Sequence, residues 1–134
     1  MGQAVRKLEE SGGISCLLIE DSNFDQRHIV RMLHAAGRVD LAIAATLEEA
    51  RKELARSTFD LILMDNALPD GLGVDFALEL RKIDRYRDLP ILIASDFPSP
   101  FMFDKAMAAR VRRVLTKSEL RPRHIRDLWR EDRE

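Results

Sequence analysis

The chain has 134 residues, of which 46% are hydrophobic and 34% are charged. This length suits one domain, and the balance of apolar and charged residues excludes a disordered chain. The net charge of -1 excludes a polycationic nucleic-acid binder, and the single cysteine, Cys16, excludes a disulfide framework. No apolar run approaches the roughly 18 residues that a membrane helix needs.

The beginning of the chain is polar and lacks the apolar stretch of an export signal. We expect residues 1–13 to form a flexible tail and residues 14–134 to form one folded domain. A myristoylation site is not expected, because Arg6 stands where that motif needs serine or threonine. These features favour a cytoplasmic protein.

Three short apolar runs predict strands that are buried on both faces of a parallel sheet. They lie at residues 16–19, 61–64 and 91–94. Weaker runs at 39–45 and 111–115 bring the number of predicted strands to five.

Helical patterns separate these runs, and several have recognisable start or stop residues. The first helix is expected to end at Gly37, a typical C-cap residue. Thr46 opens a capping box before the second helix, and Ser99 followed by Pro100 predicts the start of the fourth. Ser118 is expected to cap the last helix.

Strict alternation of strands and helices with short connections predicts an α/β domain built on a doubly wound five-stranded parallel sheet. Ligands of such sheets bind beyond the carboxyl ends of the strands. The residues at those ends are therefore the candidates for chemistry. They are Glu20, Asp21, Asp65, Ser95 and Lys117.

Carboxylates gathered at one edge of a sheet repel one another. Two of them about 4 Å apart do so by roughly 4 kcal/mol at an effective dielectric constant of about 20. Mg²⁺ removes this repulsion because it prefers carboxylate oxygens as ligands. Lys117 and Ser95 would contact a further anion, and a carboxylate beside them can attack a phosphoryl group and become an acyl phosphate.

In their order and spacing, these residues resemble the receiver domains of two-component response regulators. The matching parts are the acidic pair Glu20 and Asp21, the stretch 61–71 that contains Asp65, Ser95 and Lys117. Each part alone is weak, but the ordered set is specific and covers residues 14–129. The resemblance implies a flavodoxin-like fold with strand order 2-1-3-4-5.

The resemblance also implies a role for each residue. Asp65 would be the phosphoacceptor, and Lys117 and Ser95 would contact the phosphoryl oxygens. The implied Mg²⁺ ligands are Glu20 through water, Asp21, Asp65 and the backbone carbonyl of Ala67.

Three positions depart from the usual pattern of the family. Ser118 replaces the usual proline after the active-site lysine, and Val114 replaces the usual aromatic switch residue. The basic string at 110–113 replaces a small residue. The first departure affects the expected loop geometry, and the other two affect signalling more than phosphorylation chemistry.

We therefore expect a stand-alone receiver that takes a phosphoryl group on Asp65 from a histidine kinase or phosphotransfer protein. It would be no conventional enzyme and would at most catalyse its own phosphorylation and dephosphorylation. A receiver-like module that acts independently of phosphorylation is the alternative. A small phosphohydrolase is a further alternative, although Ala67 stands where such enzymes commonly carry a second carboxylate. No helix-turn-helix follows the receiver, so direct DNA binding is not expected.

The region from Phe97 to Arg113 is the expected output surface, together with the last helix. Phe101, Met102 and Phe103 are consecutive, so they point around about 200° of a helix and cannot all face the sheet. We expect at least one of them to be exposed. This surface would bind an output protein or a second copy of the chain, while Phe97 would shield an acyl phosphate from water.

Overall fold

A computed structural model describes residues 13–133 of the chain. Its central sheet consists of β1 (Gly13–Ile19), β2 (Arg38–Ala44), β3 (Leu61–Met64), β6 (Ile91–Ser95) and β7 (Arg113–Thr116). All neighbouring pairs are parallel, and the order is β2-β1-β3-β6-β7. The predicted strand order is therefore confirmed. The predicted tail lies outside the described residues, except for Gly13, which begins β1.

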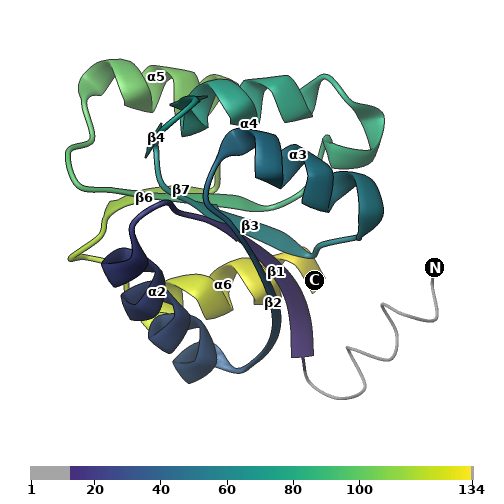
Figure 1. The fold of residues 1–134 in the computed structure, drawn as a ribbon, viewed down its shortest axis with the longest axis vertical. Coiled ribbons are helices and arrows are strands. Elements are labelled where there is room, and N and C mark those ends of the chain that lie inside the picture. The colour runs from purple at the N-terminus through teal and green to yellow at the C-terminus, as the bar shows by residue number, and fades with distance from the viewer. Residues whose placement is uncertain (1–12, 134) are drawn as a thin grey trace.

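Helices cover both faces of the sheet (Figure 1). On one face lie α2 (Asn23–Ala36) and α6 (Pro122–Arg133), and on the other lie α3 (Leu47–Arg56), α4 (Gly73–Arg81) and α5 (Pro100–Ala108). A small hairpin of β4 (Ala67–Leu68) and β5 (Gly71–Leu72) follows β3, and a 3-10 turn, η1 (Asp84–Tyr86), follows α4. No helix within residues 13–133 is long and apolar enough to cross a membrane.

The alternation of side chains along each strand divides the core between the two faces. Leu17 and Ile19 of β1 pack with the α3, α4 and α5 side, whereas Cys16 and Leu18 pack with the α2 and α6 side. Burial of each such aliphatic side chain contributes about 1.5–3 kcal/mol. The continuous apolar run of β1 thus follows from its burial on both faces. Burial also raises the pKa of the Cys16 thiol.

The predicted helix caps are present at three positions. The Thr46 hydroxyl accepts a hydrogen bond from the Glu49 N–H at 3.0 Å, and the Ser99 hydroxyl accepts one from the Met102 N–H at 3.2 Å. Gly37 follows α2 as its C-cap. A Cβ at Gly37 would come within 2.9 Å of the Trp129 ring, so glycine lets α6 pack closely against the end of α2.

The predicted start of the last helix at Ser118 is wrong, because α6 begins at Pro122. Residues 116–119 instead close a turn of their own. The Thr116 N–H donates to the Glu119 carboxylate at 2.9 Å, and the Glu119 N–H donates to the Thr116 hydroxyl at 3.1 Å. Proline suits the first position of a helix, which explains where α6 begins.

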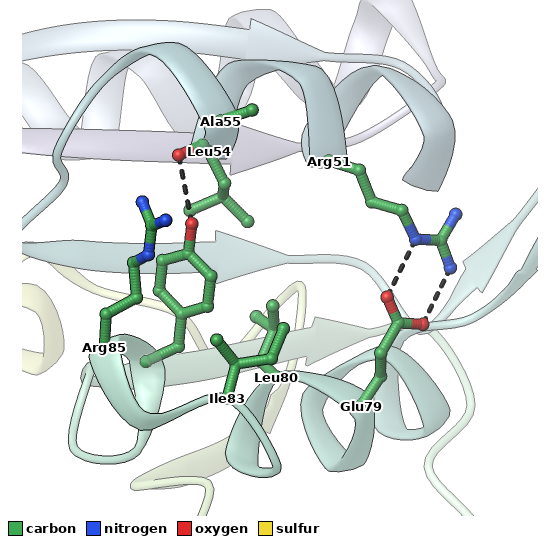
Figure 2. A pocket seen from close by; sticks show the side chains of 8 residues that line it. Arg51, Leu54, Ala55, Glu79, Leu80, Ile83 and Arg85 are labelled. Atoms are coloured by element: carbon green, nitrogen blue, oxygen red, sulfur yellow. Dashed lines mark hydrogen bonds and ion pairs between the residues drawn. The ribbon is translucent and has the colours of Figure 1, made fainter.

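Two contacts join α3 to α4 and η1 beside a cavity of about 290 Å³ (Figure 2). The Arg51 guanidinium donates two hydrogen bonds to the Glu79 carboxylate, each 2.8 Å long. The Tyr86 hydroxyl donates to the Leu54 carbonyl at 3.0 Å. These contacts fix the spacing of α3 and α4 on one face of the sheet.

Candidate functional site

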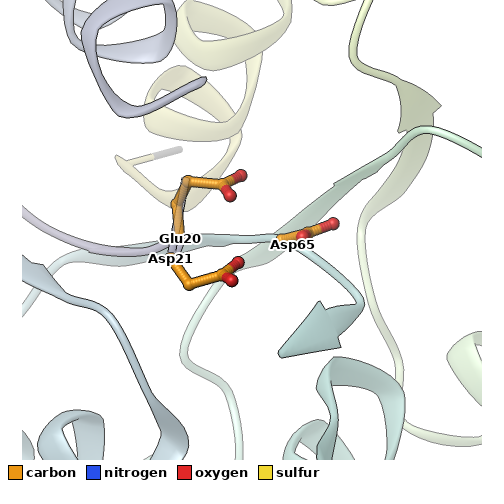
Figure 3. Close-up of side chains that lie close together, drawn as sticks. All are labelled: Glu20, Asp21 and Asp65. Carbon is orange, nitrogen blue, oxygen red and sulfur yellow. The ribbon is translucent and has the colours of Figure 1, made fainter. Parts of the chain in front are cut away.

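Three acidic side chains meet at the carboxyl ends of β1 and β3. Glu20 and Asp21 follow β1, and Asp65 follows β3. Their carboxylates offer oxygens that all lie within 4.8 Å of one another. Figure 3 shows them extending from the ends of the two adjacent strands. The strand order reverses beside β1, and this is where parallel α/β sheets bind ligands.

Asp65 is buried, and its surroundings act on the pKa of its carboxyl in opposite directions. Burial raises the pKa of its carboxyl, while the Lys117 ammonium and the N–H groups of Asn66 and Ala67 lower it. The Asn66 N–H donates to Asp65 Oδ1 at 2.8 Å, which fixes the orientation of the carboxylate. The other oxygen, Oδ2, faces Lys117.

Glu20 is fully buried, and this burial raises the pKa of its carboxyl. The Ser22 N–H donates to Glu20 Oε2 at 3.1 Å. The second oxygen, Oε1, lies 3.0 Å from Lys117 Nζ but accepts no hydrogen bond of good geometry from any described residue. Glu20 therefore keeps capacity for a further ligand at a buried position.

Lys117 is the one buried ammonium among the buried polar residues that the structure describes. Its Nζ lies 2.6 Å from Asp25, 3.0 Å from Glu20, 3.6 Å from Asp65 and 3.9 Å from Asp96. Burial alone would lower the pKa of Lys117, but the surrounding carboxylates, chiefly those of Asp25 and Glu20, raise it above its usual value. The group therefore stays positively charged.

The remaining predicted residues lie at the same edge of the sheet. Ser95 is buried at the end of β6, and its carbonyl accepts a hydrogen bond from the Lys117 N–H at 3.1 Å. Ala67 begins β4, and Asp21 is exposed. The structure thus brings all the predicted site residues to one edge.

Asp25 is the residue that sequence reasoning missed. It lies in the first turn of α2, where its N–H donates to the hydroxyl of the N-cap residue Ser22 at 3.2 Å. An acidic residue in a first turn is common because it complements the helix dipole, so its sequence position gave no reason to single it out. Its partner Lys117 is 92 positions away along the chain.

The loop after Asp65 is held in place by its own backbone contacts and by α3. The Gly73 N–H donates to the Asn66 carbonyl at 2.7 Å, and the Val74 N–H donates to the Asn66 side chain at 3.0 Å. The Asp70 carboxylate accepts hydrogen bonds of 2.9 and 3.0 Å from the first two N–H groups of α3. These N–H groups lower the pKa of Asp70.

An apolar surface extends from this edge along α5. Phe101 is 74% exposed and Met107 is 79% exposed, whereas Met102 is buried. The expectation that at least one of the three consecutive residues is exposed is confirmed. Phe97 is 90% exposed, so its ring does not cover Asp65 in this structure. A cavity of about 300 Å³ lies at the start of α5, between Leu72 and Phe101.

Comparison with known proteins identifies relatives of this chain. PilR of Pseudomonas aeruginosa, a response regulator protein, is 32% identical over 100 residues, which are 75% of this chain and 22% of PilR. The response regulator receiver protein CpdR of Brucella abortus is 31% identical over 112 residues, which are 84% of this chain and 88% of CpdR. The chain therefore spans a small part of the first relative and most of the second.

Solved structures share the fold. The receiver domain of a sensor histidine kinase from Pseudomonas aeruginosa, which has a magnesium ion coordinated in its active-site cleft, matches with a TM-score of 0.77 and 27% identity. The match covers 91% of this chain and 99% of that one. A receiver domain protein from Methanospirillum hungatei has a TM-score of 0.75 and 20% identity, over 88% of this chain and 91% of its own.

The family model for the response regulator receiver domain matches residues 16–129. This range includes every predicted site residue and extends from β1 into α6. The chain belongs to the response regulator receiver domain family.

Proposed function

We propose that this receiver accepts a phosphoryl group on Asp65 in a Mg²⁺-dependent reaction and signals by binding another protein. The donor would be the phosphohistidine of a histidine kinase or phosphotransfer protein. The observation that carries this proposal is the position of the Lys117 ammonium, 3.6 Å from Asp65 Oδ2 beside the three clustered carboxylates. A buried cation and a set of hard oxygen ligands at one point suit the charge of a phosphoryl group.

The donor atoms fit Mg²⁺. Glu20, Asp21, Asp65 and the carbonyl of Ala67 would hold the ion, in part through water. In support, Glu20 Oε1 accepts no hydrogen bond from the described residues, and Asp21 is open to solvent. When bound, Mg²⁺ would neutralise the carboxylates and the phosphoryl oxygens.

Asp65, Lys117 and Ser95 would carry out the phosphoryl transfer itself. An oxygen of Asp65 would attack phosphorus, so that a P–O bond forms while the P–N bond to the donor histidine breaks and the imidazole leaves with its electron pair. Lys117 and Ser95 would donate to the phosphoryl oxygens and stabilise the charge that the transfer brings to the site.

We further propose that the protein acts as a stand-alone cytoplasmic receiver rather than as part of a DNA-binding regulator. The match to CpdR, over 88% of the length of that receiver protein, supports this assignment. The net charge of -1 gives no support to direct nucleic-acid binding. The output partner, or a second copy, would bind the exposed side chains of α5 in the region from Phe97 to Arg113, together with α6.

Labelling with acetyl phosphate and Mg²⁺ tests the proposal. Intact-mass measurement should show one added phosphoryl group on the wild type and none on Asp65→Asn, which is near-isosteric. Asp104→Asn, a change at an exposed residue of α5, is the control and should label fully. Absence of label on the wild type would instead favour the alternative, a receiver-like module that acts independently of phosphorylation.

A further inference from the structure

The shortest contact of Lys117 is to a carboxylate outside the predicted site. Asp25 Oδ2 lies 2.6 Å from Lys117 Nζ and accepts a hydrogen bond from it, whereas Asp65 Oδ2 lies 3.6 Å away. A separation of 3.6 Å is too long for a hydrogen bond. While Asp65 carries no phosphoryl group, Lys117 is therefore hydrogen-bonded to Asp25 and not to Asp65.

The position of Asp25 in α2 explains why its side chain is available for this contact. It is the third residue of the helix, from which an acidic side chain usually reaches back to the N-cap N–H. Here the N–H of the N-cap residue Ser22 donates to Glu20 instead. The Asp25 carboxylate is thus directed to Lys117, and the positive end of the α2 dipole favours its negative charge.

The contact is also sheltered from solvent. The Lys117 side chain is 10% exposed and that of Asp25 is 24% exposed. Hydrogen bonds between charged groups are short and strong, and they strengthen as water is excluded. A phosphoryl oxygen at Asp65 would therefore compete with this contact for the Lys117 ammonium.

We infer that Asp25 is a positioning residue, which holds the Lys117 ammonium against α2 until a phosphoryl group on Asp65 draws it away. The inference rests on the proposed function, because it concerns the same lysine and the same phosphoacceptor. Phosphorylation then includes an exchange of partners in which Lys117 gives up Asp25 for a phosphoryl oxygen. Asp25 therefore lowers the affinity of the site for a phosphoryl group.

The binding of beryllofluoride, a phosphoryl mimic, with Mg²⁺ tests this inference, and ¹⁹F NMR gives the dissociation constant without relying on turnover. Asp25→Ala should bind beryllofluoride about tenfold more tightly than the wild type, the order expected for loss of one competing charge-assisted hydrogen bond. Asp25→Asn, which preserves the shape of the side chain, should show a smaller gain in beryllofluoride affinity. This variant can replace Asp25→Ala in the test if the alanine variant does not fold.

A matched control is Asp75→Ala. Asp75 also lies in the first turn of a helix, α4, and pairs with a lysine, Lys105, at 3.0 Å. Its removal should leave beryllofluoride affinity unchanged. A merely structural role of Asp25 at the start of α2 would weaken binding on mutation, so the direction of the change separates the two roles.

Repeating the measurement in the Lys117→Gln variant shows whether Asp25 acts through Lys117. In Lys117→Gln, the additional Asp25→Ala change should produce no gain in affinity. Equal or weaker binding by Asp25→Ala alone, or a gain that persists without the lysine, overturns the inference while the proposed function stands. If the wild type itself does not bind beryllofluoride, the proposed function fails and the inference falls with it.

Discussion

Gly73 lies directly against the backbone of Asp65. A Cβ atom at Gly73 would come within 2.5 Å of the Asp65 carbonyl oxygen and 3.1 Å of the Asn66 Cα. Both neighbours are backbone atoms, so rotation of a side chain cannot relieve the clash. The start of α4 can therefore approach Asp65 this closely only with glycine at this position.

Gly73→Ala should displace the Asp65 segment and lower stability. We expect a loss of about 1–3 kcal/mol in the free energy of unfolding, the usual cost of overpacking a close contact. Phosphorylation by acetyl phosphate should also slow, because the Asp65 carboxylate moves relative to Lys117. Denaturant unfolding and labelling rates per folded molecule measure the two effects. Unchanged stability and labelling would show that the segment adapts without cost.

We expect Mg²⁺ to stabilise the wild type, and Asp21→Ala should remove this stabilisation. Ligand binding to the folded state alone stabilises it, by about 1.4 kcal/mol at a Mg²⁺ concentration of about ten times Kd. Without Mg²⁺ the variant should be at least as stable as the wild type, because one repelling carboxylate is gone. The change in Tm with added Mg²⁺ measures this effect. A full Mg²⁺ response in the variant would place the metal elsewhere.

Arg81→Met should destabilise the connection after α5. The Arg81 guanidinium donates to the carbonyls of Ala109 at 2.7 Å, Tyr86 at 2.7 Å and Arg110 at 3.3 Å. Loss of these bonds should cost about 1.5–3 kcal/mol in the free energy of unfolding. Arg56→Met is the control: its exposed pair with Glu53 should be worth less than about 1 kcal/mol. Similar losses in both variants would contradict a special role for Arg81.

His124 should make stability depend on pH around and below 6.5, the usual pKa of histidine. Burial, and then the positive charges of Arg113 and Arg123, lower the pKa of His124 below its usual value. The unfolded chain therefore binds a proton more readily, and the contribution of His124 to stability falls as pH drops below about 6.5. Protonation would also remove the hydrogen bond that Nδ1 accepts from the Arg121 N–H at 3.0 Å.

Thermal unfolding of His124→Gln across this pH range checks the expectation. Glutamine keeps an acceptor for the Arg121 N–H but does not titrate, so the slope of Tm against pH should decrease. His34→Gln, at an exposed position in the last turn of α2, is the matched control and should keep more of the slope. The reverse ranking would assign the pH dependence to another group.

Phe101→Ser should weaken association with an output partner or a second copy. The Phe101 ring is exposed beside the cavity at the start of α5 and lies under the Lys105 ammonium. Aromatic residues are enriched at the buried centres of interfaces. Sedimentation and pull-down with and without beryllofluoride measure association. Ile43→Ser, at an exposed site on β2, should have no effect, and an equal loss there would place the interface elsewhere.

Much of the fold was predictable because strands that are buried on both faces appear in the sequence as continuous apolar runs. The apolar runs of β1, β3 and β6 needed no further context, and parallel pairing then brought the residues after them to one edge. Glu20 and Asp65 lie together for that topological reason, although they are far apart in the chain.

Other features depend on side-chain contacts that leave no local pattern. Ser118 has the residue type of a helix cap, but the reciprocal contacts of Thr116 and Glu119 close a separate turn first. The contact of Asp25 with Lys117 joins a helix start to a strand end, and no periodicity connects the two. This contact could therefore be identified only from the structure.

The two outer strands of the sheet, β2 and β7, affect how copies of the chain can associate. β2 and β7 each pair with one neighbour among the described strands, and an open strand edge is a template for another molecule. β2 carries Arg38 and Asp40, while β7 has only four residues and begins at Arg113. Charged side chains on β2 and the short length of β7 discourage the addition of another strand, so they disfavour edge-to-edge aggregation between copies of this chain.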